Sequence, residues 1–417
     1  MKTPGLHAAT SSDAEKRVRL AYVVSHPIQY QAPLLRRIAQ ERDIALRVLY
    51  GSDFSVRGYR DEGFGVELRW DVPLLHGYAS EFLPALRDNG TVSATSPISR
   101  GVYRRLRKAD GGAAFDAVWL HGYASVNALQ TMVAAKALGI PVLLRAEGWL
   151  GDRERSGWKL AAKGAFFAAL REGVSAVLPI GTRNAEYWRH YLGDEVPQFA
   201  MPYAVDNAWF ARRAAAADVE TLRAELGLKP GRPVVLFASK LQARKHADHL
   251  LEAVARRDAG RAESERAYVV VVGDGEERAA LETQCAALAM QPDVRFAGFR
   301  NQTELPAFFR LADVFVLPSR HEPWGLIVNE AMASGCAVVV SSDVGSHVDL
   351  VNEAVGRVYP VGDVAALTAA LEAVLASPAT WQTMGESAAA RMATWSYEED
   401  VRGLRAALAH VTRRIVA

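Results

Sequence analysis

Two glutamates, Glu322 and Glu330, lie eight positions apart in the segment HEPWGLIVNEAMASG. The apolar run ADVFVLPSR before them predicts a strand, and Pro323 suits the start of the helix that follows. Gly325 permits close approach of the backbone to a ligand. A helix start supplies free N–H groups and a positive dipole end, which suit a phosphate group. Two carboxylates on either side of a phosphate are well placed to accept hydrogen bonds from sugar hydroxyls.

The elements that position these carboxylates follow a regular alternation. Short apolar runs such as RLAYVV, ALRVLY, PVVLFAS and YVVVV alternate with helix-length amphipathic segments. Buried parallel strands read as continuous apolar runs, and strands that alternate with helices indicate βαβ units. We therefore predict an α/β protein with two doubly wound, Rossmann-like domains.

The segment AMPYAVDNAWF interrupts this alternation, so we place the domain boundary there. We predict an N-terminal domain over residues 1–203, a C-terminal domain over residues 204–396, and a helix at about 397–417 that packs back on the N-terminal domain. Open α/β sheets bind ligands beyond the carboxyl ends of their strands, so the cleft between the domains is the expected site.

Composition narrows the class of protein. The 417 residues are 50% hydrophobic and 23% charged, and the net charge of +2 demands no nucleic acid partner. The two cysteines, Cys285 and Cys336, lie in apolar segments, which is typical of a reducing compartment. No stretch approaches the roughly 20 apolar residues of a membrane span, and the N-terminus lacks a signal-peptide pattern. We therefore expect a cytoplasmic protein.

With its Glu-x7-Glu spacing, the HEPWGLIVNEAMASG segment resembles the signature of the retaining glycosyltransferases of family 4, which have the GT-B architecture. In that family the first glutamate contacts the transferred sugar and the second binds the ribose of a nucleotide-sugar donor, which implies these roles for Glu322 and Glu330. FASKLQARKH resembles the family's strand-loop-helix segment, with Lys240 and Lys245 at its two basic positions. Two cations across a loop suit a diphosphate leaving group. The family more often has Arg where Lys240 stands, so a point charge replaces a bidentate fork.

The resemblance extends to other loops. VVVGDGEE resembles the family's Gly-Asp-Gly turn, and FAGFR matches the place where the nucleotide base is met. In the first domain, SHPIQYQAP stands where many members have a Gly-rich loop, and His121 is similar to a histidine near the donor sugar. The implied catalytic residues are Glu322, Lys245, Lys240 and His121. The implied donor-binding residues are Glu330, Gly325, Leu326, Pro323, Trp324, Gly273, Asp274, Gly275, Phe299 and Arg300. The candidates for binding acceptor or sugar are His26, Gln29, Tyr30, Arg145 and Glu147.

Structural roles remain the alternative for several of these residues. His26, Gln29, Arg145 and Glu147 suit a structural role as well as a functional one, and Gly273 and Gly275 also suit tight turns.

The resemblance implies a metal-independent transferase that moves a hexose-type sugar from a nucleoside diphosphate sugar to a saccharide, lipid-linked or small-molecule hydroxyl. No two Asp residues are two positions apart, and we expect no His/Cys cluster, so we expect no metal and no cofactor beyond the donor co-substrate. A nucleotide-sugar epimerase and a non-catalytic nucleotide-sugar-binding subunit are the alternatives. The basic run at 100–108 and the amphipathic segment 157–172 suit peripheral contact with an anionic membrane. A helix of a soluble domain that extends its Lys and Arg side chains to water suits the second segment equally well.

Overall fold

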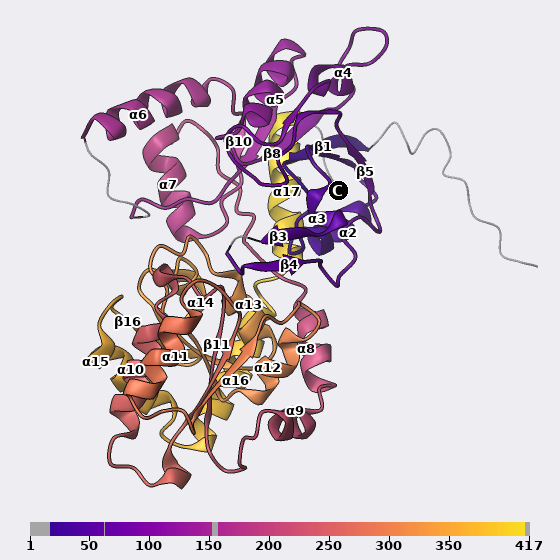
Figure 1. Cartoon of the computed structure of the whole chain (residues 1–417). Coiled ribbons are helices and arrows are strands. Elements are labelled where there is room, and N and C mark those ends of the chain that lie inside the picture. The colour runs from indigo at the N-terminus through magenta and orange to yellow at the C-terminus, as the bar shows by residue number, and fades with distance from the viewer. Residues whose placement is uncertain (1–16, 62, 152–156, 413–417) are drawn as a thin grey trace, which may run out of the picture.

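The computed structural model describes residues 17–61, 63–151 and 157–412. The N-terminal residues 1–16 and the last residues of the expected C-terminal helix, 413–417, lie outside the described residues. Two six-stranded parallel sheets form the centres of two domains, the first above the second in Figure 1. The predicted α/β fold with two doubly wound domains is confirmed.

The first sheet has the order β10-β9-β8-β1-β2-β5, with all pairs parallel. Its central strand VRLAYVV is nearly all buried because helices cover both of its faces. The strands are β1 (Val18–Val24), β2 (Ile44–Tyr50), β5 (Ala79–Phe82), β8 (Ala117–His121), β9 (Val142–Arg145) and β10 (Ala176–Val177). The helices are α2 (Ala32–Ala39), α3 (Phe54–Arg57), α4 (Val102–Leu106), α5 (Val126–Ala137), α6 (Gly157–Arg171) and α7 (Thr182–Leu192).

The second sheet has the order β13-β12-β11-β14-β15-β16, with all strands parallel. The strand order runs outward in opposite directions from β11 and β14, as in dinucleotide-binding folds. The strands are β11 (Val234–Ala238), β12 (Tyr268–Val272), β13 (Val294–Gly298), β14 (Val314–Leu317), β15 (Ala337–Ser341) and β16 (Gly356–Tyr359). The helices are α8 (Asn207–Ala215), α9 (Val219–Glu225), α10 (Ala247–Asp258), α11 (Arg278–Ala287), α12 (Leu305–Leu311), α13 (Leu326–Ala333), α14 (His347–Leu350), α15 (Val364–Val374), α16 (Pro378–Met392) and two 3-10 turns, Ala243–Lys245 and Glu263–Glu265.

Two antiparallel hairpins follow β2 and were not predicted. They are β3 (Tyr59–Asp61) with β4 (Val66–Leu68), and β6 (Ala85–Arg87) with β7 (Ile98–Ser99). Their strands are two to three residues long and carry polar or exposed residues, so they lack the apolar runs by which strands are recognised. Figure 1 shows β3 and β4 between the two domains.

The last helix, α17 (Tyr397–Thr412), returns to the first domain, where it packs against β8 and α2 (Figure 1). Val401, Leu404 and Leu408 on α17 are buried in the same apolar cluster as β1. Arg405, which follows Leu404 and is partly exposed, pairs with Asp43 at 2.9 Å. Residues at the two ends of the chain therefore stabilise one domain together.

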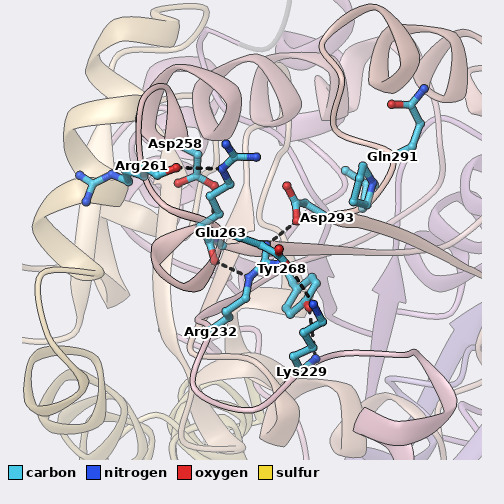
Figure 2. Close-up of polar contacts among 12 residues, drawn as sticks. Lys229, Arg232, Asp258, Arg261, Glu263, Tyr268, Gln291 and Asp293 are labelled. Carbon is cyan, nitrogen blue, oxygen red and sulfur yellow. Dashed lines mark hydrogen bonds and ion pairs between the residues drawn. The ribbon is translucent and has the colours of Figure 1, made fainter.

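The amino edge of the second sheet is closed by a polar network (Figure 2). Arg232 stacks on the Tyr268 ring, 3.8 Å from its centroid, and pairs with Asp293. Lys229 pairs with Glu263 at 2.7 Å. These ion pairs hold together the loops at this edge of the sheet. Ligand binding is expected at the carboxyl edge, as in other open α/β sheets.

Membrane-spanning candidates were sought among the described helices. None of them is both long and apolar enough alone, and only α15 with the segment Pro378–Thr412, bent by 96°, reaches the required length and hydropathy as a pair.

Candidate functional site

A cavity of about 400 Å³, here named the interdomain cavity, lies between the carboxyl edge of the second sheet and the first domain. Loops after β11, β13 and β14 reach it because the carboxyl ends of parallel strands meet at one edge. The predicted residues that line it are Gln29, Lys240, Lys245, Phe299, Arg300, Glu322, Gly325, Leu326 and Glu330. The structure thus brings together residues that lie about 300 positions apart in sequence.

Lys245 and Glu322 form the buried centre of this cavity. The Lys245 ammonium donates a hydrogen bond to the Glu322 carboxylate, and Arg244 lies 3.5 Å from the same carboxylate. Burial lowers the pKa of Lys245 although the Glu322 charge acts in the opposite direction. Arg244, which the sequence analysis did not single out, adds a third cation beside Lys240 and Lys245.

The backbone before α13 brings Glu322 close to the helix start. Gly325 has φ +86°, and a Cβ there would lie 3.1 Å from both Leu317 and Val344, so only glycine fits without displacement. α13 begins at Leu326, so the prediction that Pro323 starts this helix is wrong. Pro323 also does not line the interdomain cavity. The left-handed residue at Gly325 separates the turn that carries Glu322 from the helix.

Trp324 was predicted to bind the donor, and the structure contradicts this. Its side chain is 3% exposed, and its indole donates a hydrogen bond to Asn329 Oδ1 at 2.9 Å. Its ring stacks on Trp395, with 5.7 Å between centroids. Trp324 therefore fastens α13 to the segment after α16, because a large apolar ring gains more from burial in the core than from the polar cavity.

Glu330 faces the interdomain cavity from the second turn of α13. Burial raises the pKa of its carboxyl to about 8. A carboxyl that stays protonated near neutral pH both donates and accepts hydrogen bonds, which suits a sugar with vicinal hydroxyls.

Replacing Glu330 by glutamine is expected to stabilise the fold at alkaline pH. The ordinary pKa is 4.5, so between pH 4.5 and about 8 the unfolded chain loses a proton that the folded chain keeps, and stability falls as pH rises. Thermal unfolding should show a gain for Glu330→Gln that grows from pH 5 to pH 8. Glu372→Gln, on a half-exposed side chain of α15, is the control and should show no such growth. A gain equal at both pH values would contradict the burial of Glu330.

Lys240 does not stand free in the cavity. Its ammonium donates to both carboxylate oxygens of Asp61, at 2.7 and 2.9 Å, and lies 4.9 Å from the Phe64 ring centroid. Burial acts to raise the pKa of Asp61, but hydrogen bonds from Lys240 and from the Phe64 and Gly63 backbone outweigh it, and the pKa is lowered. The β3–β4 hairpin of the first domain therefore places the Asp61 carboxylate against Lys240, a residue predicted to bind the diphosphate.

The same hairpin region contributes aromatic residues that sequence reasoning missed. Tyr59, Phe64 and Trp70 line the interdomain cavity, and Phe64 packs edge-on against Phe299, 4.9 Å between centroids. A second link across the domains joins Asp71 to Thr303. No signal in the 51–101 segment marks these residues, because their partners lie in the other domain.

Replacing Asp61 by asparagine is expected to tighten binding of nucleoside diphosphates about 5-fold. The carboxylate competes with the diphosphate for Lys240, and a partly exposed ion pair contributes about 1 kcal/mol. Isothermal titration measures the change. Asp71→Asn is the matched control, since Asp71 also bridges the domains but contacts Thr303 instead of a cation. Weaker binding by Asp61→Asn would show that Asp61 holds Lys240 in position for the ligand.

Gly273, Asp274 and Gly275 do not line the interdomain cavity, contrary to the prediction. A Cβ on Gly273 would lie 1.9 Å from the Ser239 carbonyl oxygen, and one on Gly275 2.5 Å from that of Leu241. Asp274 accepts hydrogen bonds from the Gly275 N–H and from Arg278. This turn supports the Lys240 loop from behind, so the glycines are required for backbone packing.

A second cavity, of about 470 Å³ and here named the first-domain cavity, lies at the carboxyl ends of β1, β8 and β9. It brings together His26, His121 and Glu147. Burial lowers the pKa of His26 to about 4 and that of His121 to about 3. Both imidazoles are therefore neutral at physiological pH. Gln31 Nε2 lies 3.2 Å from His121 Nδ1 and 3.1 Å from His121 Nε2.

Glu147 lies where the two cavities approach each other. It accepts hydrogen bonds from Tyr203 at 2.8 Å and from Tyr30 at 3.4 Å. Burial raises the pKa of Glu147, and the Glu322 charge across the cleft raises it further. Tyr30 itself lines a neighbouring pocket beside α2 and α8, which it shares with Gln29. The Tyr30–Glu147 contact therefore joins the loop after β1 to the loop after β9.

Arg145 does not reach either cavity, so its predicted role in binding acceptor or sugar is wrong. The side chain is 1% exposed. Its guanidinium pairs with Asp400 on α17 at 3.0 Å and donates to the carbonyls of Met201 and Pro202. Arg145 ends β9, and the pleat directs it to the face of the sheet that α17 covers.

One group of potential metal ligands was missed, because the sequence analysis expected no His/Cys cluster. His246, Asp248 and His249 at the start of α10 offer ligand atoms within 4.8 Å of one another. The two imidazole rings stack with 4.3 Å between centroids and 17° between planes. An ion shared by both would have to lie outside at least one ring plane, where imidazole has no lone pair, so this geometry does not suit a metal site.

Comparison with known proteins finds similarity over most of the second domain. A family model described as "Glycosyl transferases group 1" matches residues 218–391. The chain is 36% identical over 186 residues to 2-deoxystreptamine glucosyltransferase of Streptomyces kanamyceticus, and 35% identical over 196 residues to D-inositol 3-phosphate glycosyltransferase of Nocardia farcinica. These alignments cover 43% and 45% of this chain and 45% and 42% of the two relatives. The chain thus spans less than half the length of the curated relatives it matches.

Solved structures extend the likeness to both domains. HepE from Anabaena, solved in complex with UDP, superposes with a TM-score of 0.70 at 15% identity, covering 94% of this chain and 100% of that one. At this identity the comparison shows the fold, and the fold is GT-B, as predicted.

Proposed function

We propose that this chain, whose residues 218–391 form a group 1 glycosyltransferase domain, is a retaining glycosyltransferase that uses a nucleoside diphosphate sugar. It moves a hexose-type sugar to a hydroxyl of a saccharide, lipid-linked or small-molecule acceptor. The observation that carries the proposal is the convergence of Lys240, Arg244 and Lys245 with Glu322 and Glu330 in one interdomain cavity. The cations match the charges of a diphosphate, and the carboxylates match the hydroxyls of the two sugars that it joins.

The cations supply the main catalytic effect in this proposal. Negative charge grows on the diphosphate as the sugar leaves, and preorganised cations in a water-poor site stabilise that charge. Lys245 is the best placed of the three, since it is 8% exposed and held by Glu322. No protein nucleophile is assigned, and the leaving phosphate takes the proton of the acceptor hydroxyl. The solved complexes of HepE with UDP and with UDP-glucose support a nucleotide-sugar donor for this fold.

The proposal also excludes a metal from the reaction. The three cations and the start of α13 take the place that a divalent ion holds in metal-dependent transferases. Turnover is therefore expected to continue in EDTA.

A panel of UDP-, GDP-, ADP- and TDP-sugars tests the proposal, with saccharide and glycolipid acceptors and with EDTA present. Release of one nucleoside diphosphate, with sugar transferred to the acceptor in the donor's anomeric configuration by NMR, supports it. A product epimerised at the sugar without transfer would favour an epimerase. Donor binding without any product would favour a non-catalytic subunit. Inversion at the anomeric carbon, or loss of activity in EDTA, would refute the retaining and metal-independent parts.

The same proposal places the enzyme in the cytoplasm, peripherally on the inner face of a membrane. A groove of about 720 Å³ between α4 and α5 is lined by exposed apolar side chains, among them Leu86 and Val133, 63% and 71% exposed. Arg100 lines it too, and Arg104 and Lys108 are exposed on or after α4. Apolar side chains with a basic border match an anionic lipid surface.

Around Phe167 and Leu170, the two buried residues of α6, the segment 157–172 supports the soluble alternative. Phe167 is 1% exposed, and the Lys163 ammonium lies 4.3 Å from the Tyr191 ring centroid, so this part of α6 packs on α7. Trp158 at the start of α6 is 72% exposed. We therefore assign the membrane contact to the groove between α4 and α5.

Vesicle flotation tests this contact. The chain should float with phosphatidylglycerol vesicles and not with phosphatidylcholine vesicles. The double variant Arg104→Glu/Lys108→Glu should bind at least 10-fold more weakly, because each basic residue near an anionic surface contributes about 1 kcal/mol. Arg212→Glu, on an exposed position of α8 in the second domain, is the control. Equal binding to both lipids would refute the membrane contact.

A further inference from the structure

We infer that the first-domain cavity selects a neutral or cationic hydroxylated acceptor with an apolar face, and excludes acceptors that carry phosphate or carboxylate. This ligand class rests on the proposed function, because it assumes that the cavity next to the donor receives the acceptor. It goes beyond that function by stating the charge of the second substrate.

The walls of the first-domain cavity are largely apolar. Val23 and Leu120 line it from the strand ends, Ile28 lines it from the loop after β1, and Val92 and Ala94 line it from the loop before β7. Its volume of about 470 Å³ is within the range of small-molecule sites. Apolar walls with a few convergent polar groups suit a ring that shows one apolar face and one edge of hydroxyls.

The described residues that line this cavity include no lysine and no arginine. The nearest cation on β9, Arg145, is held by Asp400 and by backbone carbonyls on the other face of the sheet. The two histidines do not compensate, since burial keeps the pKa of each well below neutrality. Arginine and lysine are the usual protein ligands of phosphate and carboxylate, and an anionic acceptor finds neither side chain among the described residues of this cavity wall. The charge of Arg145 acts on His121 and Glu147, but its guanidinium donates its hydrogen bonds to Asp400 and to backbone carbonyls.

The start of α5 also faces this cavity. Free N–H groups at a helix start attract anions, so this feature would favour an anionic acceptor. The N–H groups of Val126, Ala128 and Leu129 are used within the fold. The Val126 N–H donates to the Ala94 carbonyl at 2.9 Å, and the Ala128 N–H donates to Ser125 Oγ at 3.2 Å. Ser125 caps the helix, so little of its N-terminal hydrogen-bonding capacity remains for a ligand.

Glu147 is the acidic side chain among the described residues that line the cavity. Its carboxylate is held in place by the Tyr30 and Tyr203 hydroxyls, and its remaining oxygen sites can accept a hydrogen bond from an acceptor hydroxyl or ammonium. An acceptor phosphate at the same place would lie against this carboxylate, and two like charges repel each other.

Saturation-transfer NMR on the full chain tests this inference without any need for turnover. The probes are methyl glucoside, glucosamine, glucose 6-phosphate and glucuronate, which share one ring and differ in charge. Methyl glucoside and glucosamine are expected to bind at least 10-fold more tightly than the two anions. Val92→Arg, which adds a cation at a 53% exposed position of the cavity wall, should raise the affinity for glucose 6-phosphate about 10-fold. Val358→Arg, 39% exposed in β16 of the second domain, is the matched control.

Tight binding of glucose 6-phosphate or glucuronate to the unaltered chain would overturn the inference, as would failure of both methyl glucoside and glucosamine to bind. The donor panel is read separately. If the charge preference is found but no nucleotide is released, the ligand class of the cavity stands and the proposed transferase fails. If nucleotide is released but anionic probes bind best, the transferase stands and the inferred acceptor class fails.

Discussion

Replacement of Lys245 by alanine is expected to lower the rate of nucleotide release about 10²- to 10³-fold, which corresponds to the loss of one preorganised group that stabilises developing negative charge. Lys245 is buried, and its ammonium is held by Glu322 in the interdomain cavity. The effect should fall mainly on the maximal rate, because the charge on the leaving diphosphate grows in the transition state.

Two comparisons separate catalysis from folding in this prediction. Lys229→Ala removes a lysine that is 70% exposed at the opposite edge of the same sheet, and should leave turnover unchanged. The double variant Lys245→Met/Glu322→Gln removes both charges and avoids an unpaired buried carboxylate. It should fold as stably as the parent and still lack activity. Nucleotide release at the parental rate by a folded Lys245→Ala chain would contradict the assigned role.

Replacement of Arg145 by methionine is expected to lower the free energy of unfolding by about 3–5 kcal/mol, because it leaves the Asp400 carboxylate buried and unpaired. The Asp400 side chain is fully buried, and burial raises its pKa to about 7 even with Arg145 beside it. Urea unfolding at pH 8 measures the loss. The double variant Arg145→Met/Asp400→Leu should recover most of it, since an apolar pair of similar size replaces the buried ion pair.

The Arg145 variants also decide between a structural and a binding role. Activity per folded molecule should stay near the parental value in both variants, because Arg145 reaches neither cavity. A stable Arg145→Met chain that has lost acceptor-dependent turnover would restore the original prediction that Arg145 binds acceptor or sugar.

The sequence predicted the fold well because both domains are built on fully buried parallel strands. Runs such as VVLFA and YVVVV have no exposed face, so burial leaves a continuous apolar signal. The segment 51–101 gave no such signal. Its strands are short and polar, and the hairpin at Tyr59–Leu68 gains much of its packing from Phe299 and Lys240 in the other domain.

For the site, sequence reasoning placed residues at the correct edge of each sheet but did not give the direction of each side chain. Arg145 and Glu147 follow the same strand, yet Arg145 points to α17 and Glu147 to the cavity. Trp324 stands between Glu322 and Gly325, and its ring turns into the core. The Asp61–Lys240 pair was out of reach because it joins residues 179 positions apart through a contact between domains.

The most direct test is isothermal titration of the unaltered chain, in EDTA, with UDP, GDP, ADP and TDP and with the corresponding nucleoside monophosphates. The affinity for each diphosphate is compared with that for its monophosphate. If the interdomain cavity is a diphosphate site, one diphosphate should bind at least 10-fold more tightly than its monophosphate, and Lys245→Ala should abolish that difference. Equal affinities for the diphosphate and the monophosphate, unaffected by Lys245→Ala, would contradict the claim that the cations of this cavity hold the diphosphate of the donor.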